Sequence, residues 1–259
     1  MKTTGYILLD GGKIYYELSG NKDGRPLLLM HGGLGRSEEM NAMVQHLSST
    51  FRLIRVDFRG HGRSTPGDVP LTYAQYQKDV EAVLAYLDIE QFAIFGFSDG
   101  GIVAYRLAAA HPERVERLMT LGAQWRLEKD DVSVALLQSL TAEMWMARYP
   151  NDVERYKALN PEPDFERLVS LVKVLWLDSS ATGYPGRSVE DIRCPTLILR
   201  GEDDFLFALS EAELLKTKIA DCHFVSIPLT AHASHQESPE LVGAMVNDFL
   251  LSDKIETTF

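Results

Sequence analysis

The stretch from residue 91 to residue 110 constrains the fold more than any other part of this sequence. The apolar run 92–95 predicts a strand, and the alanine- and glycine-rich run that starts near Asp99 predicts a helix, which Pro112 stops. Between them lies Gly96-Phe97-Ser98-Asp99-Gly100. A strand that enters a helix through so short a turn needs residues without a Cβ atom on both sides, because side chains there would clash.

Strands and helices alternate along most of the chain. Apolar runs predict strands at 13–18, 26–30, 51–58, 91–97, 115–122, 195–199 and 223–228, and amphipathic patterns predict helices at 37–47 (with Ser37 as N-cap), 72–87 (with Thr72 as N-cap), 99–110, 208–219 and 239–250. This alternation predicts a mostly parallel sheet with right-handed crossovers. From residue 124 this alternation breaks. One helical pattern runs through Leu137, Leu140 and Met144 and a second from Phe165 to Trp176, and four prolines interrupt the region: Pro150, Pro161, Pro163 and Pro185. We therefore expect an α/β core at 1–123 and 193–259 and an inserted helical cap at 124–192.

The composition narrows the class of protein. The chain of 259 residues has a net charge of -11, which disfavours nucleic acid and anionic membranes as partners. There is no signal-peptide pattern and no apolar run long enough to span a bilayer. We interpret Cys194 and Cys222 as small apolar packing residues, and so low a number of cysteines fits a reducing compartment. No His/Cys spacing predicts a metal site. We expect a cytoplasmic protein without cofactor or metal, and a homodimer is left open.

Ser98 is the candidate nucleophile. It occupies the centre of a Gly-x-Ser-x-Gly pattern in the strand–turn–helix context that lifts a serine Oγ above the end of a sheet and directs a helix N-terminus at the reacting carbonyl. A plain turn is the alternative for so short a motif. A serine here argues against epoxide hydrolases and haloalkane dehalogenases, which need an aspartate nucleophile.

A serine nucleophile needs a base and an acid, which follow it in the order acid, then histidine, in this kind of fold. Asp203 and Asp204 follow the apolar run 195–199, and His232 and His235 follow the run 223–228. The residue types alone leave both pairs open.

From Ile14 to Leu250 the sequence resembles the α/β-hydrolase family. The family pattern Gly-x-x-Asp falls on Asp204, and the pattern His-x-x-x-x-Glu-x-Pro-Glu falls on His232. The resemblance implies a mostly parallel, eight-stranded sheet flanked by helices, with His232 as the base and Asp204 orienting it. Asp203 remains a fallback, and His235 is expected to pack. The stretch 57–64 also matches the family, and we interpret it as a structural turn with a non-catalytic His61.

The backbone donors that would stabilise a reacting carbonyl oxygen come from two places. One is the N–H of Asp99, directly after the nucleophile. The other lies in His31-Gly32-Gly33-Leu34-Gly35, where the resemblance favours Gly33, with Leu34 next.

The residue after the nucleophile bears on the substrate. Gly-Phe-Ser-Asp-Gly-Gly followed by Ile102, together with the run 194–202, resembles the valacyclovir-hydrolase (biphenyl-hydrolase-like) branch, in which the matching aspartate is implicated in binding an α-ammonium group. A carboxylate beside Oγ would attract a cation. Alternatively, Asp99 is simply a favourable acid in the first turn of a helix. Aromatic and sulfur side chains are candidates for the pocket or, equally, for the core: Phe97, Trp125, Met144, Trp145 and Trp176.

These observations predict a serine hydrolase that acts on a small ester through an acyl-enzyme, with a preference for α-amino-acid esters as the finer hypothesis. Carbon–carbon bond hydrolases, thioesterases, amidases and perhydrolases share the fold and remain alternatives. A ligand receptor with low turnover also remains open, because fold and function are separable.

Overall fold

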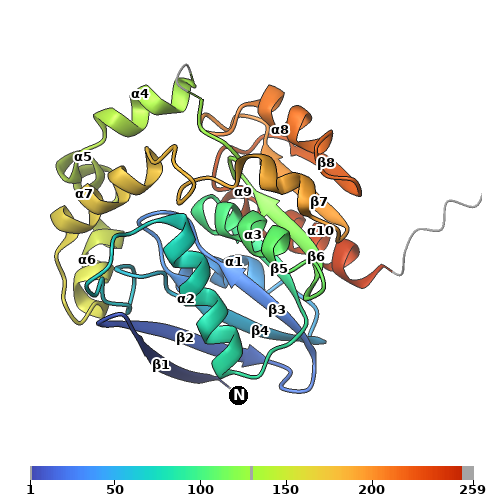
Figure 1. Cartoon of the computed structure of the whole chain (residues 1–259), viewed down its shortest axis with the longest axis horizontal. Helices are drawn as coiled ribbons and strands as arrows, with labels where there is room; N and C mark the ends of the chain where they lie inside the picture. Colours follow the sequence, from blue (N-terminus) through green and yellow to red (C-terminus); the bar gives the residue numbers. More distant parts are fainter. Residues whose placement is uncertain (1, 129–130, 253–259) are drawn as a thin grey trace, which may run out of the picture.

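Residues 2–128 and 131–252 are described by the structure, a computed structural model (Figure 1). Eight strands form one sheet in the order β1-β2-β4-β3-β5-β6-β7-β8. The pairs β1–β2 and β2–β4 are antiparallel, and the remaining pairs are parallel. The strands are β1 Thr3–Leu9, β2 Gly12–Gly20, β3 Arg25–Met30, β4 Phe51–Val56, β5 Phe92–Phe97, β6 Val115–Leu121, β7 Thr196–Gly201 and β8 Cys222–Ile227. The predicted mostly parallel, eight-stranded sheet is confirmed.

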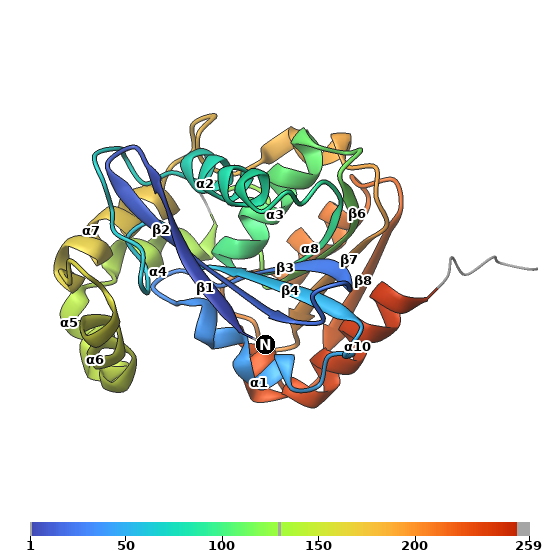
Figure 2. The same ribbon diagram turned by 90° about the horizontal axis from the view of Figure 1, so that it is seen from below.

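Helices cover both faces of this sheet (Figure 2). Because side chains alternate along a strand, Leu28 and Met30 of β3 belong to the hydrophobic core that also contains residues of α2 (Tyr73–Tyr86), α3 (Asp99–Ala110) and α8 (Leu209–Lys216). Leu27 and Leu29 pack on the other face with α1 (Asn41–Val44) and α10 (Pro239–Leu251). Burial on both faces explains why the sequences of these strands are continuous apolar runs.

Among the described residues, four α-helices lie between β6 and β7 and gather at one side of the sheet (Figures 1 and 2). They are α4 Val132–Ser139, α5 Ala142–Arg148, α6 Pro150–Leu159 and α7 Phe165–Trp176. We call them the α4–α7 segment. Two 3-10 helices, η1 Ser37–Met40 and η2 Gly186–Asp191, and the short α9, Ser234–Glu237, complete the fold.

The structure corrects three sequence predictions. Ser37 is not an N-cap, because it lies inside η1 and its N–H donates to Asp57, and the predicted helix at 37–47 is only η1 followed by the short α1. The first helical pattern after residue 124 is two helices, because Leu140 is extended and Thr141 caps α5 by accepting from the Met144 N–H. Pro150 begins α6 rather than interrupting a helix, since the first turn needs no N–H there. Thr72, by contrast, caps α2 as predicted.

Candidate active site

Ser98 lies at the turn between β5 and α3, and its backbone is strained. Its φ of 51° and ψ of -118° belong to a region that residues other than glycine rarely adopt. The strain persists because α3 approaches β3 closely: a Cβ atom at Gly100 would overlap the carbonyl oxygen of Met30. The sharp turn that the glycines predicted is therefore present, and it holds Ser98 at the carboxyl end of the parallel strands.

The structure brings His232 and Asp204 to Ser98 from two later strands. His232 Nε2 lies 3.1 Å from Ser98 Oγ, and His232 Nδ1 lies 2.9 Å from Asp204 Oδ1. Because an ionised carboxylate only accepts, Nδ1 carries the proton and Nε2 presents its lone pair to the serine hydroxyl. Burial pushes the pKa of Asp204 upward, but its hydrogen bonds with His232 and with two backbone N–H groups outweigh this effect and leave the pKa below its ordinary value.

Asp203 and His235, the alternative acid and histidine from the sequence, lie in the same two loops but make other contacts. Asp203 is exposed, and its N–H donates to the Thr230 carbonyl. His235 is buried with its ring against Phe97, 4.3 Å between centroids. In the described part of the chain neither ring nitrogen of His235 has a hydrogen-bond partner, and burial lowers its pKa to about 3.

Residues 31–35, which we call the glycine loop, are fixed by two buried histidine rings. His31 Nδ1 donates to the Gly32 carbonyl over 2.7 Å, and His61 Nε2 accepts from the Leu34 N–H over 3.0 Å. Burial lowers the pKa of His31 to about 4 and that of His61 to about 3, so both rings are neutral near pH 7. The loop is thus held from two sides by groups that carry no charge.

Two backbone N–H groups near Ser98, one in the glycine loop and one at the start of α3, have no partner among the described residues. Within residues 2–128 and 131–252, neither the Gly33 N–H nor the Asp99 N–H donates to another protein group. The Leu34 N–H, our second candidate from the sequence, is already bound by His61. Of the three predicted donors, Gly33 and Asp99 therefore keep a free N–H in the described part of the chain.

The Asp99 side chain is buried, at 3% exposure, and faces the glycine loop. Its carboxylate accepts from Trp176 Nε1 over 2.9 Å and from the Tyr73 hydroxyl over 3.0 Å. A Cβ atom at Gly33 would lie 2.7 Å from Asp99 Oδ2 and 2.6 Å from Trp176 Cζ2. Burial raises the pKa of Asp99 to about 6, although both hydrogen bonds oppose the shift.

Comparisons with known proteins agree with this geometry. Residues 25–177 match the model of the alpha/beta hydrolase fold family. The chain is 28% identical to a protein assigned as carbamate hydrolase RutD in Caulobacter sp. (strain K31), over 92% of this chain and 95% of that one. It is 32% identical to a proline iminopeptidase of Xylella fastidiosa (strain 9a5c), over 46% and 40%. The crystal structure of a hydrolase from Pseudomonas aeruginosa PA01 superimposes with a TM-score of 0.77 at 26% identity, covering 96% of this chain and 98% of that one.

The chain belongs to the α/β-hydrolase family. It is an enzyme of that family, as the sequence predicted. In the described residues of this hydrolase, no group of three or more His, Cys, Asp and Glu side chains is arranged to hold a metal ion. None of its described helices is long and apolar enough to cross a membrane.

The aromatic candidates for the hydrolase's pocket lie in different places. Phe97 is buried under the glycine loop, with its ring 5.0 Å from that of His232. Trp125 is buried beside Glu211, and Trp145 packs on Tyr149 within the α4–α7 segment. Trp176 contacts Asp99 directly. Its partner Tyr73 was missed in the sequence, since no local motif marks a tyrosine at the start of a helix as a site residue.

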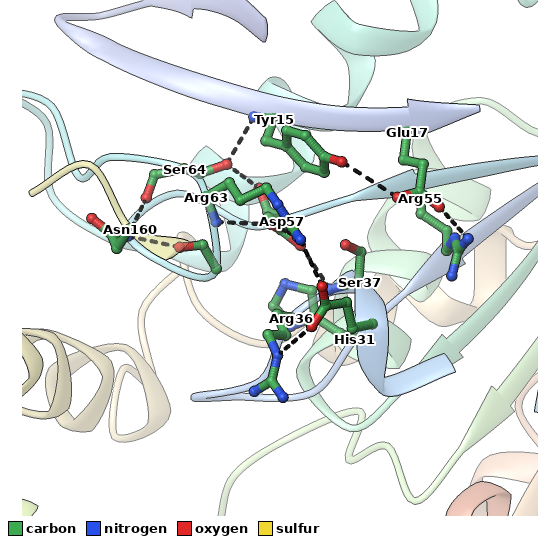
Figure 3. A network of polar contacts seen from close by, with 12 residues as sticks. Tyr15, Glu17, His31, Arg36, Ser37, Arg55, Asp57, Arg63, Ser64 and Asn160 are labelled. Carbon is green, nitrogen blue, oxygen red and sulfur yellow. Dashed lines mark hydrogen bonds and ion pairs between the residues drawn. The ribbon is translucent and has the colours of Figure 1, made fainter. Parts of the chain in front are cut away.

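The α4–α7 segment is attached to the hydrolase core close to this site. Asn160, at the end of α6, donates to the carbonyls of Ser64 and Gly62 over 2.9 and 3.1 Å (Figure 3). The same turn is tied down by Asp57, whose carboxylate accepts from the Ser37 and Arg63 N–H groups. The stretch 57–64 is thus a turn that buried polar contacts stabilise. The end of α6 binds to the same turn through Asn160.

Proposed function

We propose that this hydrolase cleaves small carboxylic esters through an acyl-enzyme formed on Ser98. The observation that carries the proposal is the strained Ser98, whose Oγ lies 3.1 Å from His232 Nε2 while the far side of that ring is held by Asp204. Nucleophile, base and orienting acid stand in the relation that this chemistry requires.

Acylation follows from the proton positions. His232 Nε2 takes the Ser98 proton as Oγ attacks the ester carbonyl carbon, and Asp204 stabilises the resulting imidazolium. The Gly33 and Asp99 N–H groups donate to the oxygen that becomes negative. When the tetrahedral intermediate collapses, the C–O bond to the alcohol breaks and His232 returns the proton to the leaving oxygen. Water, activated by the same histidine, then hydrolyses the acyl-enzyme.

The finer part of the proposal is a preference for α-amino-acid esters. An acyl group whose carbonyl oxygen meets Gly33 would have its α-substituent near Asp99, because that carboxylate lies against Gly33. With a pKa of about 6, Asp99 is ionised near pH 7.5 and would attract an α-ammonium group. The location under α7, rather than in solvent, favours this role over that of a plain first-turn acid.

We also propose that residues 124–192 act as a cap over the site, with 1–123 and 193–259 as the catalytic core. Trp176 supports this proposal because it reaches both Asp99 and the surface of Gly33 from α7. In this arrangement the indole forms one wall of the acyl pocket.

The mechanism is tested by labelling and turnover together. A fluorophosphonate should add to wild type at Ser98, seen as a mass shift of the peptide that contains it, and Ser98→Ala should abolish both labelling and ester hydrolysis. Asp204→Asn should lower kcat by roughly 10⁴-fold, since the imidazole would be held in the wrong tautomer. Asp203→Asn is the matched control and should keep wild-type turnover. Absence of label on wild-type Ser98 would refute the mechanism.

The substrate preference needs its own comparison. Wild type should hydrolyse a valine ester with a higher kcat/KM than the N-acetylated ester, and Asp99→Asn should lower kcat/KM for the free amine by about 10- to 100-fold, the worth of a hydrogen bond to a charged group. The N-acetylated ester should be affected much less. Equal rates on both esters with wild type would refute the preference for the amine but leave the mechanism standing.

A further inference from the structure

We infer that Glu39 is a positioning residue for this reaction, because its carboxylate joins the glycine loop to the loop that carries His232. The inference rests on the proposed function, since it assigns Glu39 a role through the Gly33 donor and the His232 base. Glu39 lies in η1 and matches no motif that marks a catalytic residue.

Two hydrogen bonds define the junction. Glu39 Oε2 accepts from the Gly32 N–H over 3.0 Å, and Glu39 Oε1 accepts from Gln236 Nε2 over 3.2 Å. A Cβ atom at Gly35 would lie 2.7 Å from Glu39 Oε2, so the carboxylate fills the inside of the glycine loop. Gln236 belongs to α9, which follows His232 directly.

The neighbouring Glu38 has a different task. Its carboxylate accepts from the guanidinium groups of Arg36, Arg63 and Arg155, and these bonds hold its pKa well below its usual range. Glu39 instead meets a backbone N–H and an amide. Two adjacent glutamates therefore bind different partners, and only Glu39 contacts the glycine loop.

The contact with Gly32 matters because the Gly32–Gly33 peptide carries the proposed donor. The Gly32 carbonyl is held by His31 and by the Gly35 N–H, and the Gly32 N–H is held by Glu39. The two bonds to the Gly32 carbonyl restrain the Gly32–Gly33 peptide, and Glu39 restrains the preceding His31–Gly32 peptide, so both peptide planes that meet at Gly32 are set before a substrate arrives. A preorganised donor acts mainly in the transition state. Without Glu39 the His31–Gly32 peptide loses this restraint, and through Gly32 the Gly33 N–H can tilt away from the oxygen.

The bonds of Glu39, rather than its charge, carry this role. Burial raises the pKa of Glu39 to about 7, while nearby Arg36 and His232 favour its ionised form and Asp152 opposes it. A neutral acid or amide at this position still offers an oxygen to the Gly32 N–H. Glutamine should therefore substitute for glutamate, and alanine should not.

The test compares Glu39→Ala with Glu39→Gln, each with the concentration of active sites fixed by fluorophosphonate labelling. Glu39→Ala should lower kcat for a model ester by about 10- to 100-fold with KM changed less than about threefold, because misplacing a transition-state donor costs rate and not ground-state binding. Glu39→Gln should stay within about threefold of wild type. Glu81→Ala is the matched control: Glu81 is a half-buried glutamate on α2 that binds Gln77 and His111, and its loss should leave kcat unchanged.

Two further variants keep the inference falsifiable. If Glu39→Ala does not fold, Glu39→Asp replaces it, since the shorter acid keeps the charge and loses the reach to Gly32. Gln236→Ala should lower kcat by only a few-fold, because its bond is exposed, and its effect should not add to that of Glu39→Ala. Wild-type kcat in Glu39→Ala, or a loss in Glu39→Gln as large as in Glu39→Ala, would overturn the inference. A wild type that hydrolyses no ester would instead refute the proposed function.

Discussion

Two regions of the molecule meet at the candidate site, and they are held by different kinds of contact. The turns at the carboxyl end of the sheet depend on close approaches of backbone to backbone, as between Gly100 and Met30. The α4–α7 segment is attached near the site by side chains that reach across to the core, among them Asn160, Arg155 and Trp176. The first region has no room for an added atom, whereas the second depends on individual hydrogen bonds.

The largest effect is expected when the same substitution is made at the carboxyl end of the sheet and at a glycine that follows the α4–α7 segment. Gly100→Ala should destabilise the protein by about 3 kcal/mol, because the new Cβ would overlap the main chain of β3, which cannot rotate away. Gly186→Ala, in η2 after the segment, has open space around its Cβ and only an unfavourable φ of 55°, so it should cost about 1 kcal/mol. Urea denaturation of both variants measures the difference, and equal losses would contradict it.

The same difference decides what could be predicted from the sequence. The turn at Ser98 and the strands around it were predicted because a few neighbouring residues determine them. Asp204 and His232 were selected by family patterns, and the structure then brought both to Ser98. By contrast, the contact of Trp176 with Asp99 joins residues 77 positions apart, and no local pattern encodes it. Helix α6 was missed because Pro150 breaks a helix in most positions but is favourable in the first turn.

A smaller effect is expected at the contact that attaches α6. Asn160→Ala should cost about 2 kcal/mol, since it leaves buried carbonyls of the turn at 60–64 without a donor. Arg155→Ala, from the same helix, removes another contact to the core. That variant removes a bidentate pair with the half-buried Glu38, so Lys157→Ala serves as the neutral control: its ion pair with Glu154 is solvent-exposed, and Tm should stay within the error of the measurement. If Asn160→Ala and Lys157→Ala lose the same stability, α6 is not attached through Asn160.

Lowering the pH should also distinguish the two regions, with a smaller change in the free energy of unfolding. Residues 124–192 contain no histidine, whereas His31, His61 and His235 are buried at the carboxyl end of the sheet with lowered pKa values. For His235 the folded pKa is about 3 and the ordinary value is 6.5. Between these values the unfolded chain binds a proton that the folded chain does not. The free energy of unfolding therefore falls as the pH falls below 6.5, by up to about 1.4 kcal/mol per pH unit for this one group.

His235→Leu removes this titrating group. The free energy of unfolding should therefore fall less steeply between pH 6.5 and pH 5 than in wild type, whatever the effect of the substitution on packing at pH 8. The quantity to compare is the slope of the free energy of unfolding against pH. The change in side-chain volume from imidazole to leucine alters this free energy by the same amount at every pH, so it does not affect the slope. The free energy of unfolding in urea at several pH values measures it. His223→Leu on β8 is the control for replacing a histidine by leucine, since His223 is exposed to solvent. Because His31 and His61 also have lowered pKa values, part of the slope should remain in His235→Leu. A slope as steep as that of wild type would contradict the role of His235 and assign the acid sensitivity to the two histidines that hold the glycine loop.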